Sequence, residues 1–226
     1  MSSVYLVDGS TLFEARLDGT SRRVLQECGE SVALARLHGD VLNLEGNTVY
    51  YIHADDGTYA PISRGWQGDG LLAATASRLF LLERGVLVEL NDDDTYEVIG
   101  RDFRGATHMC ALGERLFVLE DGTVEEVLIE ERSWRIVRQE LREVTAMACA
   151  FGRVCVAQAD GDILAIDPDT GELDRISDAW PNTQAMAGLG DALVVLGGGA
   201  LSLLDARGEF EVISRDWLNV KSMTTS

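Results

Sequence analysis

Short apolar or alternating segments separated by polar turns run along the whole chain. One stretch shows the pattern clearly: its apolar segments are 107–111, 116–119, 124–129 and 134–138, and its turns hold Gly113-Glu114, Asp121-Gly122 and 130–133. Runs this short, punctuated by glycine and aspartate, are typical of strands and tight hairpins rather than helices. The pattern therefore predicts a unit of four short antiparallel strands.

This unit recurs, because three independent sets of positions repeat with one period of 37–39 residues. The first set ends the outermost strand of each unit: Leu25, Ile62, Ile99, Val137, Ile176 and Ile213. The second lies in the first strand: Leu34, Leu72, Met109, Met147, Met186 and Met223. The third lies between units: Cys28, Trp66, Phe103, Leu141, Trp180 and Trp217.

The repeats also close on themselves. When the two ends of the chain are joined, Met223 and Leu34 lie a further 37 residues apart, which is one more period. We therefore expect segment 220–225 to supply the first strand of a unit whose other three strands come from the N-terminus. A six-bladed β-propeller with four antiparallel strands per blade has this arrangement, whereas a solenoid gives no reason for circular spacing.

The predicted architecture is all-β, with one propeller domain over residues 1–226. The expected blades are 220–226 plus 1–27, 28–65, 66–102, 103–140, 141–179 and 180–219. Turn glycines such as Gly122 and Gly161 recur between the second and third strands, where a hairpin requires a positive backbone angle.

Single repeats resemble known propeller families. Residues 4–8 followed by 12–25 resemble the YWTD propellers of lipoprotein-receptor type, with Tyr5 and Asp8 matching the tetrad. Residues 161–171 resemble a quinoprotein-type repeat, and Ser214-Arg215-Asp216-Trp217 is similar to tectonin-like lectins. These resemblances imply the propeller architecture, and fold does not select function.

The charge composition limits the classes of partner that the protein is expected to bind. With 19 basic and 38 acidic residues the formal net charge is −19, which opposes broad contact with nucleic acid or an anionic membrane and favours a basic protein partner. No apolar run reaches the ~18 residues of a membrane span, and residues 1–7 lack the features of a signal peptide. We therefore expect a cytoplasmic protein. We also expect a monomer.

The sequence contains no pattern that is typical of a catalytic site. The cysteines Cys28, Cys110, Cys149 and Cys155 show no zinc-type spacing, and we expect them to be reduced and structural. No phosphate-binding glycine loop, metal-ligand cluster or nucleophile and base pair is present, so we predict no enzyme activity, no metal and no cofactor. The methionines of the first strands are interpreted as packing near the axis.

Two sets of residues remain as candidate sites. The aromatic rings between blades, together with arginines two positions earlier, form a candidate ligand-binding set: Arg64, Trp66, Arg101, Phe103, Trp180, Arg215 and Trp217. We favour rings wedged between blades, with the arginines stacked on them or paired with Asp102 or Asp216. The alternative is exposed rings that bind a ligand such as a sugar.

A second candidate set lies near the start of the first strands, where side chains could face the channel: His108, Thr145, Gln184 and Lys221. The function we expect is non-catalytic binding of a protein or peptide on one propeller face. The alternative is a carbohydrate-binding, lectin-like propeller that uses the arginine and aromatic positions in several blades.

Overall fold

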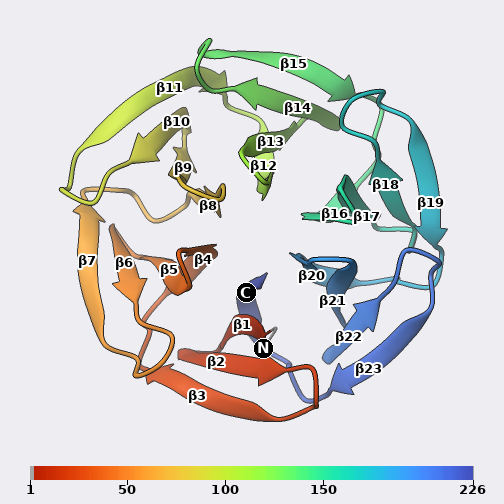
Figure 1. Ribbon diagram of the computed structural model, residues 1–226, viewed down its shortest axis with the longest axis horizontal. Coiled ribbons are helices and arrows are strands. Elements are labelled where there is room, and N and C mark those ends of the chain that lie inside the picture. Colours follow the sequence, from red (N-terminus) through yellow and green to blue (C-terminus); the bar gives the residue numbers. More distant parts are fainter. Residues whose placement is uncertain (1–2, 226) are drawn as a thin grey trace.

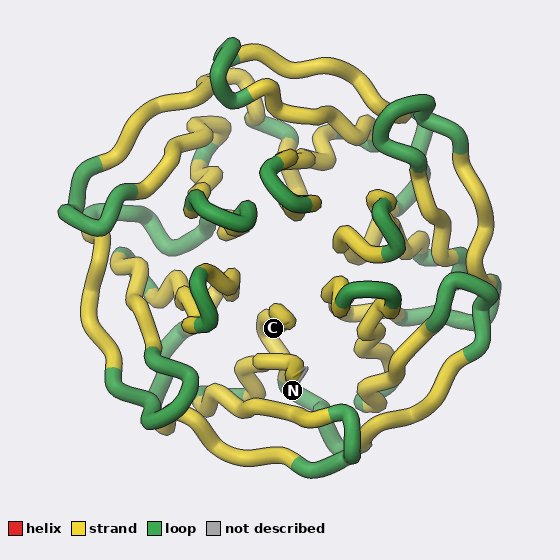
Figure 2. The backbone as a smooth tube through the Cα atoms, viewed as in Figure 1, coloured by secondary structure: helices red, strands yellow, loops and turns green. Residues whose placement is uncertain are grey.

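The computed structural model describes residues 3–225, which form 24 strands and no helix. The strands are grouped into six antiparallel sheets of four, arranged as blades around a central axis (Figure 1). Figure 2 shows that loops are confined to the turns and connections at the ends of the strands. The six-bladed β-propeller predicted from the repeats is confirmed.

The first three blades follow the N-terminal half of the chain, and each is named here from its innermost to its outermost strand. Blade 1 contains β24 (Val220–Thr225), β1 (Ser3–Asp8), β2 (Thr11–Arg16) and β3 (Ser21–Gln26). Blade 2 contains β4 (Ser31–Leu37), β5 (Asp40–Glu45), β6 (Thr48–Ile52) and β7 (Tyr59–Arg64). Blade 3 contains β8 (Leu71–Ala74), β9 (Leu79–Glu83), β10 (Gly85–Leu90) and β11 (Tyr96–Phe103).

The other three blades repeat the same order. Blade 4 contains β12 (Ala106–Leu112), β13 (Arg115–Glu120), β14 (Thr123–Leu128) and β15 (Ser133–Arg138). Blade 5 contains β16 (Val144–Ala150), β17 (Arg153–Gln158), β18 (Ile163–Ile166) and β19 (Leu173–Ser177). Blade 6 contains β20 (Thr183–Leu189), β21 (Ala192–Gly197), β22 (Ala200–Leu204) and β23 (Phe210–Ser214).

The ring closes inside blade 1, where the two ends of the chain meet (Figure 1). Strand β24 pairs antiparallel with β1, with Val4 opposite Thr225 and Leu6 opposite Met223. The C-terminal segment thus provides the inner strand of a sheet whose other three strands are N-terminal, as the circular spacing predicts.

The hydrophobic core is divided among the blades. Six clusters of buried side chains occur, one at each interface between neighbouring blades. The second strand of each blade is buried on both faces, as in β9 and β13, which explains its continuous apolar sequence. Each blade is therefore stabilised mainly by its two neighbours.

The two faces of the propeller carry different connections. The turns between first and second and between third and fourth strands open on one face, called here the pocket face. The turns between second and third strands and the connections between blades lie on the other, called the linker face. Packing on the linker face is tight: Gly122 has φ +75°, and a Cβ there would lie 2.5 Å from the Leu141 carbonyl oxygen.

Candidate functional site

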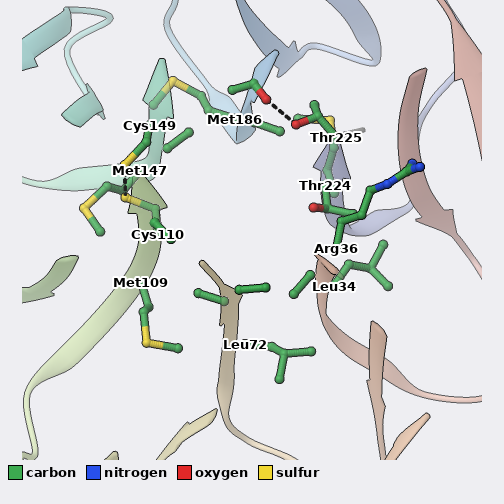
Figure 3. Close-up of a pocket in the computed structure, with 18 residues that line it drawn as sticks. Leu34, Arg36, Leu72, Met109, Cys110, Met147, Cys149, Met186, Thr224 and Thr225 are labelled. Carbon is green, nitrogen blue, oxygen red and sulfur yellow. Dashed lines mark hydrogen bonds between the residues drawn. The ribbon is translucent and has the colours of Figure 1, made fainter. Parts of the chain in front are cut away.

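A cavity of about 220 Å³ lies on the propeller axis, between the inner strands of all six blades (Figure 3). Three successive positions of each inner strand line it. These positions lie toward the pocket face, because the turn between the first and second strands follows directly after them. We call this cavity the axial pocket.

The layer of the axial pocket farthest from the pocket face is apolar and rich in sulfur. It consists of the repeat positions Leu34, Leu72, Met109, Met147, Met186 and Met223. Four of the five methionines in the chain lie in this ring. Long, flexible thioethers fill an irregular axial space well, as the sequence interpretation expected.

The next layer is mostly alanine and leaves room at the axis. Its members are Ala35, Ala73, Cys110, Ala148, Ala187 and Thr224. The third layer, nearest the pocket face, is the most varied: Arg36, Ala74, Ala111, Cys149, Gly188 and Thr225. The polar groups of the pocket therefore lie at the few positions where a larger or polar residue replaces the small residue of the repeat.

Arg36 is the one charged side chain among the residues that line the axial pocket. Its guanidinium carbon lies 4.7 Å from the centre of the Tyr5 ring, within cation–π distance. Its Nη1 is buried and has no hydrogen-bond partner among the residues that the structure describes. The guanidinium points away from the axis, toward blade 1 (Figure 3). A buried donor without a partner is costly, so Arg36 is prepared to receive an acceptor there.

Neighbouring arginines differ from Arg36. A second cavity of about 390 Å³, between blades 1 and 2, is lined by Arg36 itself together with Arg16, Arg22 and Glu14. Glu14 forms ion pairs with both of these arginines, and Arg22 also donates to the Ala54 carbonyl oxygen at 2.6 Å. Arg16 and Arg22 are therefore held by the fold, whereas Arg36 is not.

The two cysteines of the axial pocket meet at the interface of blades 4 and 5. Cys110 Sγ and Cys149 Sγ are 3.0 Å apart, and each side chain is partly exposed (Figure 3). Burial, together with the neighbouring Cys110, raises the pKa of the Cys149 thiol well above its usual value. Cys149 is therefore a protonated thiol near neutral pH.

The predicted channel residues His108, Thr145, Gln184 and Lys221 do not line the axial pocket. Thr145, Gln184 and Lys221 lie at the opposite ends of their inner strands, toward the linker face, where Gln184 and Lys221 are exposed. His108 accepts or donates a 2.9 Å hydrogen bond with Thr107 and bonds the Thr145 backbone. Burial lowers the pKa of His108. The structure brings His108 to the Thr145 backbone, and Gln184 and Lys221 occupy the position equivalent to Thr145 in blades 6 and 1.

The aromatic rings between blades lie inside the interfaces. Phe103, Trp180 and Trp217 are 2%, 9% and 7% exposed, and each belongs to the core cluster between the blades it connects. Trp66 is half-buried and packs against the cluster of blades 2 and 3. Burial of this kind supports the wedge interpretation for Phe103, Trp180 and Trp217.

The rings also contact other aromatic residues at the perimeter. Edge-to-face or tilted pairs with centroids 5.0–5.4 Å apart join each ring to the next blade: Trp66 with Tyr96, Phe103 with Trp134, Trp180 with Phe210 and Trp217 with Phe13. These are the separations at which aromatic pairs stabilise a fold.

The prediction that the three arginines stack on the rings or pair with Asp102 or Asp216 is wrong. Arg64, Arg101 and Arg215 are exposed, and none of them forms an ion pair or cation–π contact within residues 3–225. The reason is geometric: the ring turns into the interface while the residue two positions earlier remains at the solvent side of the same connection. The cation–π contacts of the described chain belong to Arg36, Arg78 and Arg115.

Carboxylates at the ends of second strands join neighbouring blades, a role that the sequence interpretation missed. Glu83 accepts hydrogen bonds from the backbone N–H groups of Gln67 and Gly68, at 2.7 and 3.0 Å. Glu120 accepts from Gly105 at 2.7 Å, and Asp8 from Asn219 at 2.9 Å. The acidic residues next to the turn glycines thus bind the connection from the preceding blade.

Arg36 and the cysteine pair were also missed as site residues. Arg36 lies two positions after Leu34 in the repeat, and the equivalent residues in other blades are alanine, cysteine, glycine or threonine. A charged residue in a column of small ones is a signal that alignment of the repeats could have provided. Cys110 and Cys149 occupy two adjacent columns, so no single column brings them together.

The described part of the chain holds no cluster of three or more histidine, cysteine or acidic residues arranged for a metal ion. Nor do residues 3–225 include a helix of the length and apolar character that a membrane crossing requires. What the axial pocket offers chemically is an apolar, sulfur-lined space with two adjoining thiols, while the unpaired guanidinium N–H of Arg36 lies off the axis, beside Tyr5 of blade 1.

Comparison with known proteins identifies solved structures that share this fold. No protein-family model matches the sequence, and no curated protein is significantly similar to it. A nidogen/laminin complex structure contains a chain that matches all of this chain and 98% of its own length, with a TM-score of 0.85 and 11% identity. U3-55K matches 98% of this chain and 84% of its own, with a TM-score of 0.65 and 13% identity.

A third similar structure is PorZ, a surface component of the type-IX secretion system of Porphyromonas gingivalis. It matches 89% of this chain and 30% of its own length, with a TM-score of 0.62 and 12% identity. At these identities the similarity establishes the propeller architecture.

Proposed function

We propose that this propeller is a non-catalytic binding module that receives a protein or peptide partner on the pocket face. In this proposal a partner segment enters the axial pocket, and one of its hydrogen-bond acceptors reaches the adjoining cavity between blades 1 and 2 and binds Arg36. The observation that carries it is the buried Nη1 of Arg36, which has no partner among the described residues. An acceptor supplied by a partner would recover the cost of that unmade bond.

The size of the axial pocket favours a macromolecular partner. Its volume of about 220 Å³ lies below the ~300–1,000 Å³ typical of sites that enclose a small molecule. Such a space suits one or two side chains of a partner whose remaining surface rests on the turns of the pocket face. The apolar Met109 and Met147 would contact the aliphatic part of the inserted segment.

The charges of this protein favour two features of a partner, one that acts over long range and one that acts at contact. The net charge of −19 attracts basic proteins over long range, while Arg36 selects a carboxylate or carbonyl oxygen at contact. The partner class that satisfies both is a basic chain segment that presents one carboxylate, either an acidic side chain or a C-terminus.

The residues of the axial pocket support a role without catalysis. Its lining contains no histidine, aspartate, glutamate or lysine that could act as a general base. A cysteine nucleophile needs such a base or a lowered pKa, and burial has the opposite effect on Cys149. Among the structurally similar chains, the nidogen structure is a complex with another protein, laminin, which is a precedent for protein binding by this fold.

Selection from a random peptide display library, followed by fluorescence anisotropy with synthetic peptides, tests the proposal. We expect Arg36→Gln to weaken the selected peptides about tenfold or more. Replacing the peptide's carboxylate with an amide should do the same. Arg207→Gln is the matched control: Arg207 is exposed in a turn of the pocket face and outside the pocket, so its loss should change affinity less than about twofold.

Equal binding of the selected peptides to wild type and to folded Arg36→Gln would contradict the proposed role of Arg36. A library that yields no binder, combined with binding on a glycan array, would replace the proposal with the carbohydrate-binding alternative.

A further inference from the structure

We propose that Cys110 and Cys149 form a redox modification site, in which a hydroperoxide entering the axial pocket converts the two thiols into a reversible disulfide between blades 4 and 5. This inference is independent of the proposed partner. It concerns cysteines that the sequence interpretation treated as structural thiols.

The position of the two cysteines is the first argument. In the column of Cys110 the other blades have Ala35, Ala73, Ala148, Ala187 and Thr224. In the column of Cys149 they have Arg36, Ala74, Ala111, Gly188 and Thr225. Packing at the axis thus requires a small residue at most of these positions and does not require sulfur. Cysteine replaces it twice, on facing positions of one interface.

The distance is the second argument. The two sulfurs are 3.0 Å apart, and a disulfide needs about 2.05 Å, so they must approach by only about 1 Å. The backbone of β16 is held from the other side, because a Cβ on Gly188 would lie 1.7 Å from the Cys149 carbonyl oxygen. We therefore expect side-chain rotation, chiefly of Cys110, to close the gap.

Access is the third argument. Both cysteines line the axial pocket and are partly exposed, and a hydroperoxide is far smaller than the cavity of about 220 Å³. The other two cysteines lack this access. Cys28 and Cys155 are 1% and 0% exposed, and burial raises the pKa of Cys155 to about 12. Oxidation should therefore select one pair out of four thiols.

The chemistry balances with hydrogen peroxide as the oxidant. The Cys110 thiolate attacks one peroxide oxygen, the O–O bond breaks, and water leaves with formation of a sulfenic acid. Cys149 Sγ then attacks Cys110 Sγ, the S–O bond breaks, and the thiol proton of Cys149 leaves in a second water. Two thiols and one peroxide thus give one disulfide and two waters. The raised pKa of Cys149 assigns the first attack to Cys110.

Peptide mapping gives a direct test, because trypsin places each cysteine in a separate peptide. Cys110 falls in 105–115, Cys149 in 143–153, Cys155 in 154–175 and Cys28 in 24–36. Folded, reduced protein is treated with hydrogen peroxide, alkylated under denaturing conditions and digested without reductant. We expect two alkylated cysteines instead of four, a cross-linked 105–115/143–153 pair, and recovery of all four thiols with dithiothreitol.

The variants are chosen from the repeat itself. Cys110→Ala and Cys149→Ala introduce the residue that other blades carry at these positions, so they should fold, and each should abolish the cross-link. Cys155→Ala removes a thiol from the adjacent strand β17 and should leave the cross-link unchanged. Oxidised wild type should also melt at a higher temperature than reduced wild type, and Cys110→Ala should show no such shift.

Retention of four alkylated thiols after peroxide treatment would overturn the inference. So would a cross-link that includes Cys28 or Cys155, or a single cysteine oxidised to sulfinic acid with no cross-link. A disulfide that lowers the melting temperature would show that the bond does not fit the native ring, and would equally overturn it.

Discussion

The indole Nε1 of Trp217 donates a 2.7 Å hydrogen bond to Oγ of Ser214, three residues earlier in the chain. The same bond joins Trp180 to Ser177 at 3.1 Å and Trp66 to Ser63 at 3.0 Å. A serine at the end of the outer strand therefore satisfies the one polar group of each wedge tryptophan. The ring can then be buried between blades without an unpaired donor.

Removing this serine should destabilise the propeller by leaving the indole N–H without its partner. For Ser177→Ala we expect a loss of about 1–2 kcal/mol in the free energy of unfolding, and for Trp180→Ala about 3–5 kcal/mol. Urea unfolding followed by circular dichroism measures both. Ala179→Ser, at the exposed position next to the tryptophan, is the control and should change stability by less than about 0.5 kcal/mol. Wild-type stability in Trp180→Ala would show that the ring is not a wedge.

Gly188 should tolerate no side chain. A Cβ there would lie 1.7 Å from the Cys149 carbonyl oxygen, and two inner strands would have to separate to admit it. Gly188→Ala should cost about 3 kcal/mol or more. Gly197 in the same blade is the matched control, because neither glycine has a positive φ and the nearest atom to a Cβ at Gly197 is 3.6 Å away. Gly197→Ala should be neutral or stabilising by up to about 1 kcal/mol. Equal effects of the two substitutions on the urea midpoint would contradict this account.

The architecture could be predicted from the sequence because each blade solves the same packing problem. Trp66, Phe103, Trp180 and Trp217 keep one register since each fills an equivalent interface. Segment 220–225 could be assigned to the first blade from spacing alone, and β24 spans those residues.

The axial pocket could not be predicted in the same way, because its chemistry lies in departures from the repeat. Whether Arg36 finds a partner depends on side-chain geometry around the axis, and the equivalent positions give no information about it. Cys110 and Cys149 lie 39 residues apart, where the two blades are offset by 38, so their contact crosses two columns. The repeat explains the architecture, and the positions that depart from the repeat indicate the site.

Two neighbouring glutamates should respond to neutralisation with opposite signs. Burial alone would raise the pKa of Glu126, but the hydrogen bonds from Arg115 and the charges of Arg115 and Arg135 outweigh it and lower the pKa. Burial and the charge of Glu120 raise the pKa of Glu125, whose buried Oε2 has no partner among the described residues. Ionisation therefore stabilises the fold at Glu126 and destabilises it at Glu125.

Linkage gives the direction with pH. The stability that Glu126 contributes is present above about pH 4.5 and is lost as the pH falls through its lower, folded pKa. We expect Glu126→Gln to lose about 1–3 kcal/mol near neutral pH, with the difference from wild type shrinking in acid. Glu125→Gln should gain up to about 1 kcal/mol near neutral pH, because it removes a buried charge. Urea unfolding at several pH values measures both, and a loss of stability in both variants would contradict the assignment.

The closure of the ring inside blade 1 should make the position of the chain ends unimportant and the presence of β24 essential. Truncation after Asn219 removes the strand that pairs Met223 with Leu6, and it exposes the inner edge of β1 with the buried Val4 and Leu6. The core cluster between blades 6 and 1 would lose Val220 and Met223. We therefore expect the melting temperature to fall by more than about 10 °C or the cooperative transition to vanish.

A circular permutant is the matched control, since it keeps every residue. A short glycine-rich linker joins the original ends, which lie together in blade 1, and new ends are opened between Asp92 and Asp93 in the exposed turn between β10 and β11. We expect this variant to fold, with a far-ultraviolet circular dichroism spectrum like that of wild type and a melting temperature far closer to it than the truncated chain. A permutant that fails to fold while the truncated chain keeps its transition would show that β24 does not complete the sheet. The interface between β24 and β1 would then contribute little to the ring, against the buried side chains on both sides of it.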